Sequence, residues 1–104
     1  MIYLMATVDV IPDKVGEFNA FLGQELAPFL GKFGMELTGS WINSIGVMHQ
    51  VVDLWSLKSL EHFEQLMTRF FKEPEFRKLD GRLRTMVTSE TTKILFPLPC
   101  SPLK

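Results

Sequence analysis

The chain has 104 residues, of which 46% are hydrophobic, and this size suits one domain with a single core. Its 11 Lys and Arg nearly balance its 12 Asp and Glu, so no long-range field would attract a nucleic-acid backbone or an anionic membrane. The single cysteine, Cys100, cannot form an intramolecular disulfide. We therefore expect one domain over residues 1–104, with no nucleic-acid or membrane partner, in a reducing, cytoplasmic location.

The first predicted strand covers Ile2 to Val10. Apolar residues occupy its even positions and mixed residues lie between them, which is the period of a strand. The segment lacks a basic leader and reaches Asp9 too early to span a bilayer. It therefore predicts a strand and not a targeting signal.

An amphipathic helix is predicted next, from Val15 to Phe33, because apolar residues recur every three or four positions. Pro28 falls inside this helix, where it removes one backbone hydrogen bond. A kink or restart is therefore expected near Ala27. Gly34 is expected to cap the end of the helix.

The second half of the chain predicts a hairpin, a helix and a strand. Residues 35–44 and 47–55 are expected to be extended and joined by a tight turn at Ile45 and Gly46. A helix follows from Leu57 to about Leu79, with Pro74 separating its last one or two turns as a short piece. Residues 86–96 are rich in Thr and Val and predict a last strand before the proline-rich tail.

This order is the ferredoxin-like βαββαβ arrangement, an α+β fold with two helices on one face of a four-stranded antiparallel sheet. Within it, the two right-handed crossovers are expected to place the first and third strands in the centre as a parallel pair. The second and fourth strands would then form the edges. The other face of the sheet is left open.

The hairpin offers two sets of side chains, and a two-residue turn places Trp41 opposite Gln50. The more apolar set, which contains Trp41, Val52 and Leu54, is assigned to the helix side. Trp41 is accordingly expected to be a core anchor whose replacement by alanine costs about 3 to 5 kcal/mol. The open face would then carry ten residues: Tyr3, Met5, Thr7, Thr38, Ser40, Ile42, His49, Val51, Asp53 and Trp55.

Such an open face is too apolar to be left wholly in water, yet it also carries polar groups. Two copies placed face to face would bury the apolar part and enclose a small, partly wet cavity. The sequence therefore predicts a homodimer that buries at least about 1,200 Å² in total.

Several short segments resemble the NIPSNAP family. Trp41, the Ile45-Gly46 turn and the strand Gln50-Val51-Val52-Asp53-Leu54-Trp55 are similar to a family pattern of a tryptophan, an Ile-Gly turn and a Gln-Val-Val-His-Leu-Trp strand. Further similar segments are Ile2-Tyr3, Leu26-Ala27-Pro28, Ser59-Leu60-Glu61, Arg69, Glu73-Pro74-Glu75-Phe76, Ile94-Leu95 and Pro97 to Leu103. The resemblance covers the whole chain and implies the dimeric α/β-barrel fold. Asp53 stands where the family pattern commonly has histidine, so any role of that imidazole does not carry over.

Four residues are predicted to line one ligand pocket per subunit, closed in part by the partner: Tyr3, His49, Asp53 and Trp55. His49 is either a general base or ligand contact, or a satisfied interface histidine. On one strand it would lie about 13 Å from Asp53, too far for a dyad. Asp53 either has a raised pKa beside Trp55 and acts as a base, or pairs with an arginine of the partner.

Other polar groups suggest no chemistry. His62 is expected to be solvated, and acidic residues interrupt the basic run of Arg77, Lys78, Arg82 and Arg84, which predicts a solvated helix end. Two histidines and one tail cysteine give no metal-ligand spacing. No glycine-rich phosphate loop or Ser, His and Asp set is present, so neither a metal nor a cofactor is expected.

Three functional hypotheses follow. The first is a homodimer that binds a small, partly apolar molecule between the two sheets without chemistry. The second is a cofactor-independent oxygenase or isomerase, by analogy with other dimeric barrels. The third is an RNA-binding domain, but residues 47–51 lack the basic and aromatic signature that its third strand should carry.

Overall fold

The structure, a computed structural model, describes all 104 residues. Its strands are β1 (Ile2–Val10), β2 (Glu36–Ile42), β3 (Gln50–Leu57) and β4 (Val87–Leu95). Helical segments connect β1 to β2 and β3 to β4, so the predicted ferredoxin-like order is confirmed. β1 has the bounds that the alternation of apolar residues predicts.

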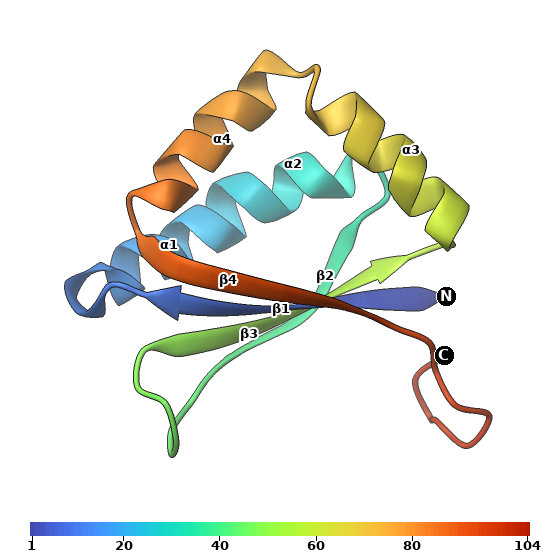
Figure 1. The fold of residues 1–104 in the computed structure, drawn as a ribbon, viewed down its shortest axis with the longest axis horizontal. Coiled ribbons are helices and arrows are strands. Elements are labelled where there is room, and N and C mark those ends of the chain that lie inside the picture. The colour runs from blue at the N-terminus through green and yellow to red at the C-terminus, as the bar shows by residue number, and fades with distance from the viewer.

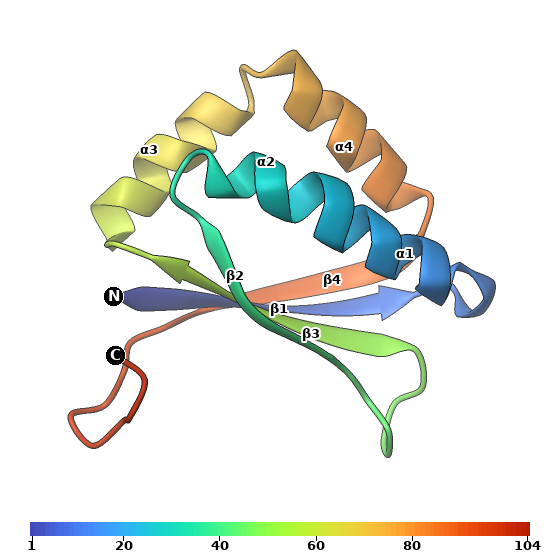
Figure 2. The same cartoon turned by 180° about the vertical axis from the view of Figure 1, so that it is seen from behind.

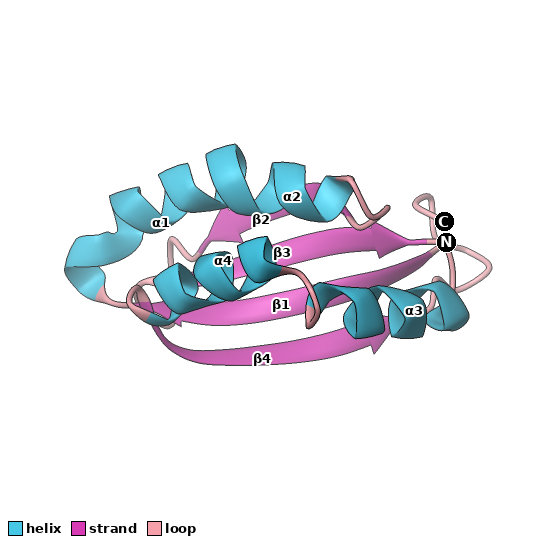
Figure 3. Cartoon of the chain, turned by 90° about the horizontal axis from the view of Figure 1, so that it is seen from above, coloured by secondary structure: helices cyan, strands magenta, loops and turns pink.

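The four strands form one sheet in the order β2-β3-β1-β4, and every neighbouring pair is antiparallel (Figure 3). β1 and β3 lie in the centre as expected, but the prediction that they run parallel is wrong. The first crossover makes β1 parallel to β2, and a hairpin then returns the chain as β3 between them. β3 therefore runs against both neighbours.

All helices lie on one face of the sheet, here called the covered face, and the opposite open face carries none (Figure 1). The first helical rod comprises α1 (Val15–Phe21), a π-helical turn (Leu22–Leu26) and α2 (Ala27–Gly31). The second comprises α3 (Leu60–Phe70) and α4 (Pro74–Arg84), which meet at an angle like the two sides of a roof. Seen from above, the first rod lies along the β2 side of the sheet and the second along the β4 side (Figure 3).

Two prolines shape the rods. Before Pro28, the backbone widens into the π-helical turn, where the Ala27 N–H donates to Leu22 O, so the predicted irregularity near Ala27 is confirmed. Gly34 has a φ of 91° and ends the rod as predicted. Pro74 occupies the first turn of α4, which fits its fixed φ and missing N–H. The prediction of a short last piece is wrong, because α4 runs for 11 residues.

The hairpin loop is longer than predicted. The Asn43 N–H donates to Gln50 O at 3.0 Å, which leaves residues 44–49 in the loop. A bulge lies between Leu37 and Gly39, and Trp41 pairs with Val52 and not with Gln50. This shift of two positions keeps Trp41 on the same side as Val52, so the loop length does not by itself exchange the faces.

The pairing of β1 with β3 decides which hairpin residues lie under the helices. Leu4, Ala6 and Val8 face the helices as predicted, and their partners across the strand pair are Trp55, Asp53 and Val51. The prediction that Trp55, Asp53 and Val51 lie on the open face is therefore wrong. Trp41 is 58% exposed on the open face, so its predicted role as a core anchor of the subunit is also wrong.

The proline-rich tail after β4 passes beneath the start of β1 on the open side of the sheet, as the two opposite views show (Figures 1 and 2). Cys100 lies in this tail with an exposed, free thiol. No helix in the structure combines the length and the hydropathy that crossing a membrane requires.

Candidate functional site

A cavity of about 300 Å³ lies between the covered face of the sheet and the two helical rods. Fourteen of its 18 lining residues are hydrophobic. A volume of this size falls at the lower end of the range for small-molecule sites, which are mostly apolar with a few placed polar groups. The cavity is thus the first candidate site of the chain.

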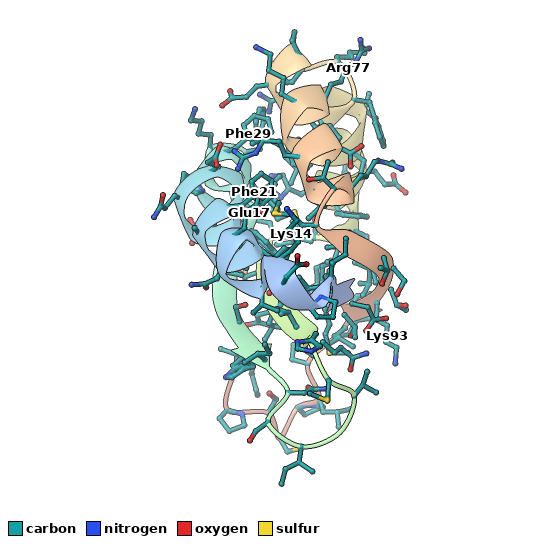
Figure 4. All side chains as sticks on the ribbon, turned by 90° about the vertical axis from the view of Figure 1, so that its left-hand side faces the viewer. Lys14, Glu17, Phe21, Phe29, Arg77 and Lys93 are labelled. Atoms are coloured by element: carbon teal, nitrogen blue, oxygen red, sulfur yellow. The ribbon has the colours of Figure 1, made fainter.

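Apolar side chains from both rods line the roof of the cavity, Phe70 and Phe76 among them, and further aromatic rings pack against these two. Phe70 at the end of α3 and Phe76 in α4 stack with ring centroids 5.5 Å apart, and Phe29 lies 6.1 Å from Phe70. Figure 4, seen from the end of the sheet where α1 begins, shows Phe21 and Phe29 between the first rod and α4. Arg77 and Lys93 project outward in the same view. The rings fix the bend between α3 and α4 and hold the roof above the sheet.

The sheet forms the floor of the cavity, and a small residue at the centre of this floor leaves space above it. Ala6 in β1 has Asp53 of β3 on one side and Thr92 of β4 on the other. All three line the cavity. A larger side chain at position 6 would occupy the space between the carboxylate and the threonine.

Asp53 is the most deeply buried polar group of this floor, with 3% of its surface exposed. Ser40 Oγ donates to its Oδ1 at 2.6 Å, and no side chain in the protein donates to Oδ2. Burial raises the pKa of Asp53, and the hydrogen bond from Ser40 opposes that change. The cavity therefore holds a carboxylate that an incoming donor can reach.

Two further carboxylates line the cavity on its β4 side. Glu90 has an exposed surface, yet the partial burial of its carboxyl raises the pKa of that group. The charges of Asp53 and Asp80 raise this pKa further, whereas the charge of Arg84 lowers it. Asp80 accepts a hydrogen bond from Arg84 Nε at 2.9 Å. No three His, Cys, Asp or Glu side chains are grouped so that they could hold a metal ion.

The four residues predicted to share one pocket lie in three places. Asp53 and Trp55 line the cavity under the helices, whereas Tyr3 is buried on the open face, to which Met5 also points. His49 belongs to the hairpin loop, with a φ of 59°, and its carbonyl accepts from the Val10 N–H. The prediction that the four line one pocket is wrong, because β1 pairs with β3 in the register that puts Asp53 beneath the rods. Its position there also removes it from an arginine across the open face.

Sequence reasoning missed Asp80, Glu90 and Thr92. The signal for two of them is the alternation of β4, because Ile94 packs on the core and Thr92 and Glu90 follow at intervals of two. A glutamate that shares one side of a strand with an isoleucine packed on the core indicates a polar group on the covered face. Asp80 is one of the acidic residues that interrupt the basic run of α4, for which the sequence predicts a solvated helix end. It lies instead one turn before Leu83, and both residues line the cavity.

The prediction that His62 is solvated is wrong, because this residue is half-buried. Its ring lies over Gly34, where a Cβ would come within 2.8 Å of Cε1, and its Nδ1 is buried without a hydrogen-bond partner. The ring packs between α3 and the end of the first rod and takes no part in the cavity.

Comparison with known proteins now identifies the family. The profile of the NIPSNAP family matches residues 3–102. The chain belongs to the NIPSNAP family. The predicted resemblance is therefore confirmed, and the solved structures below bear out the ferredoxin-like fold of the subunit.

Solved NIPSNAP structures superpose closely on this chain. An uncharacterized NIPSNAP domain protein from Burkholderia xenovorans has a TM-score of 0.88 at 22% identity, over 98% of this chain and 99% of that chain. A NIPSNAP family protein from Agrobacterium tumefaciens has a TM-score of 0.87 at 23% identity, over 99% of this chain and 98% of that chain. No curated protein matches the sequence.

The NIPSNAP fold extends to enzymes. An antibiotic biosynthesis monooxygenase has a TM-score of 0.67 at 10% identity, over 95% of this chain and all of that chain (100%). At such identity the likeness concerns the fold alone. What this NIPSNAP chain does must therefore be argued from its own cavity.

Proposed function

We propose that this NIPSNAP protein is a homodimer that binds one small, largely apolar molecule per subunit, in the cavity beneath the helices. The observation that carries the proposal is the 300 Å³ apolar cavity with the buried carboxylate of Asp53 in its floor. Apolar walls supply affinity by burying the ligand, and one polar group supplies its orientation. This location replaces the cavity between two sheets that the sequence suggests.

The energetics of the cavity support a ligand. Apolar space that no atoms fill lowers stability, by about 24 cal/mol per Å³ in engineered cavities. The Asp53 carboxylate accepts a side-chain hydrogen bond at Oδ1 alone, so Oδ2 is free to accept one from a ligand. A molecule that fills the space offsets this cost, and a donor on the molecule can add a hydrogen bond to Asp53 Oδ2.

A neutral probe tests this proposal. We expect 1-naphthalenemethanol to bind the wild-type protein in isothermal titration calorimetry with one site per subunit. Ala6→Leu should weaken its binding at least about tenfold, because the new side chain fills the floor between Asp53 and Thr92.

The matched control for this experiment is Ala20→Leu, which adds the same atoms at an exposed position of α1. That variant should bind the probe as the wild type does. Binding that Ala6→Leu leaves unchanged would place the ligand elsewhere and contradict the proposal.

The dimer is supported by the open face of the sheet. Its apolar side chains form one patch, here called the open-face patch, which consists of Met5, Trp41, Val52 and Leu54. The six-membered ring of the Trp41 indole lies against Gly39, where a Cβ would come within 2.3 Å of the ring. A tryptophan that is exposed on a sheet and held by a neighbouring residue is a typical anchor for a protein partner.

Polar groups beside the open-face patch are already satisfied within the subunit. Asn43 Nδ2 donates to Gln50 Oε1, Gln50 Nε2 donates to Asp9 Oδ1, and Ser89 Oγ donates to Asp9 Oδ2. The hydrogen bonds from Ser89 and Gln50 lower the pKa of Asp9. A second copy can therefore cover this face without leaving those groups unpaired.

Trp41→Ala should raise the dissociation constant of the dimer about 30-fold, which is the effect of losing one central aromatic anchor. Sedimentation equilibrium measures it. Phe71→Ala is the control, because Phe71 is as exposed as Trp41, at 59% against 58%, but lies after α3 on the helix side. A wild-type protein that sediments as a monomer at micromolar concentration would contradict the dimer.

A second candidate function is a cofactor-independent enzyme in which Asp53 is the general base. The raised pKa of a buried carboxyl at the cavity wall favours it. An isomerase needs only that Asp53 takes a proton from one carbon and returns it to another, whereas an oxygenase also needs dioxygen. The likeness to a monooxygenase adds fold-level support.

A further inference from the structure

We propose that the cavity is entered between α4 and β4, and that the acidic mouth there selects ligands with an amino or hydroxyl group over carboxylates. The inference rests on the proposed ligand-binding function and adds the chemical class of the ligand and the route by which it enters.

The route follows from two adjoining hollows. Outside the cavity, a second groove of about 430 Å³ runs between α4 and β4. Three residues line both the groove and the cavity: Asp80, Leu83 and Glu90. β4 is an edge strand, so nothing in the subunit lies beyond it. These three residues therefore form the boundary between the interior and solvent, and we call them the mouth.

The charges at the mouth and inside the cavity all have one sign. Asp80 and Glu90 at the mouth and Asp53 on the floor are acidic, and no Lys, Arg or His lines the cavity. The nearest cation, Arg84, lies in the outer groove, paired with Asp80 at 2.9 Å. Inward of Arg84, the path from the mouth to Asp53 thus offers acceptors and no cationic partner.

Burial is the main cause that raises the pKa of Glu90, and the charges of Asp53 and Asp80 raise it further while Arg84 lowers it, so these carboxylates already repel one another. An anionic ligand would add another negative charge in an apolar space where water screens it poorly. An ammonium or hydroxyl group would instead donate to Asp53 Oδ2, which has no side-chain donor in the protein. The amine also gains from the opposite charge.

Three probes on one scaffold test the selectivity: 1-naphthylmethylamine, 1-naphthalenemethanol and 1-naphthoate. Calorimetry at pH 7 should show the amine binding about tenfold or more tightly than the carboxylate, with the alcohol between them. In Glu90→Gln and Asp80→Asn, the ratio of amine to carboxylate affinity should fall several-fold. Glu75→Gln is the control, because it removes an exposed charge from α4 away from the mouth and should leave the ratio unchanged.

The outcomes separate this inference from the proposed function. If the alcohol binds but the carboxylate binds as tightly as the amine, the selectivity is wrong and the proposed function stands. The same holds if Glu75→Gln changes the ratio as much as Glu90→Gln, since net charge would then explain it. If no probe binds to the wild type, both the selectivity and the proposed function are overturned.

Discussion

Asp53→Asn should increase the free energy of unfolding at pH 7 by at least about 1 kcal/mol, although it changes a residue of the candidate site. Asp53 is 3% exposed, and its ionised form is poorly solvated among the apolar cavity walls. Asparagine has nearly the same shape, and its carbonyl oxygen still accepts the hydrogen bond from Ser40. The variant therefore removes a buried charge without creating a new cavity.

The pH dependence of this effect has a definite sign. Because burial raises the pKa of Asp53 above 3.8, the folded state holds the proton more tightly than the unfolded chain. The stability that this proton contributes is complete below the unfolded pKa and is lost as pH rises through the folded pKa. The advantage of Asp53→Asn should thus be small near pH 3 and grow toward neutral pH.

Urea denaturation at several pH values measures the effect. Glu64→Gln, which neutralises an exposed carboxylate on α3, is the control and should change stability by less than about 0.5 kcal/mol. A loss of stability in Asp53→Asn at pH 7 would show that the ionised carboxylate is well satisfied and would contradict its raised pKa.

The same substitution separates binding from catalysis. A binding protein should show altered affinity for 1-naphthalenemethanol and have no turnover to lose. An enzyme that uses Asp53 as its base should lose about 10² to 10⁴ in rate on any substrate that the wild type converts. A variant that is more stable yet inactive would indicate that the site is held at a cost in stability.

The sequence was sufficient to predict most of the fold. The alternation in Ile2–Val10 and the three- and four-residue spacing from Val15 onward are strong periodic signals, and both predicted elements are present. Pro28 and Gly34 have local effects that depend on their own backbone, so the irregularity near Ala27 and the end of the first rod were also predictable. The family resemblance led to the same fold.

The face of the hairpin was not predictable in the same way. Both sides of β3 carry large apolar residues, Val52 and Leu54 on one and Val51 and Trp55 on the other, so hydrophobicity alone does not identify the core side. Only the register between β1 and β3 decides which side of β3 faces the helices. That register is a pairing between segments far apart in the sequence, so no local pattern reveals it. The error placed Asp53 on the open face and Trp41 in the core.

The candidate site depends on that same register. The sequence indicates Asp53 as a possible base if it is buried beside Trp55, and both residues do line one cavity. The cavity itself arises because Ala6 faces helices whose bend holds the roof above it. Such space depends on how the helices pack on the sheet and has no signal in a single segment of the sequence.

The roof leads to the last prediction, which concerns Phe70. This residue is 2% exposed, and its ring lies 5.1 Å from that of Phe33 and 5.5 Å from that of Phe76. Phe70→Ala should lower the free energy of unfolding by about 3 to 5 kcal/mol, because it leaves a cavity and removes the contact that joins α3 to α4. Urea denaturation followed by circular dichroism measures the loss.

The adjacent residue provides the control. Phe71 is 59% exposed and touches only the edge of the cluster, with its ring 5.8 Å from that of Phe76, so Phe71→Ala should cost less than about 1 kcal/mol. If Phe70→Ala fails to fold, Phe70→Leu keeps most of the apolar volume and should show a smaller loss of the same sign. Equal losses at positions 70 and 71 would mean that the aromatic cluster does not hold the roof. The bend between α3 and α4, and with it the space above Ala6, would then need another cause.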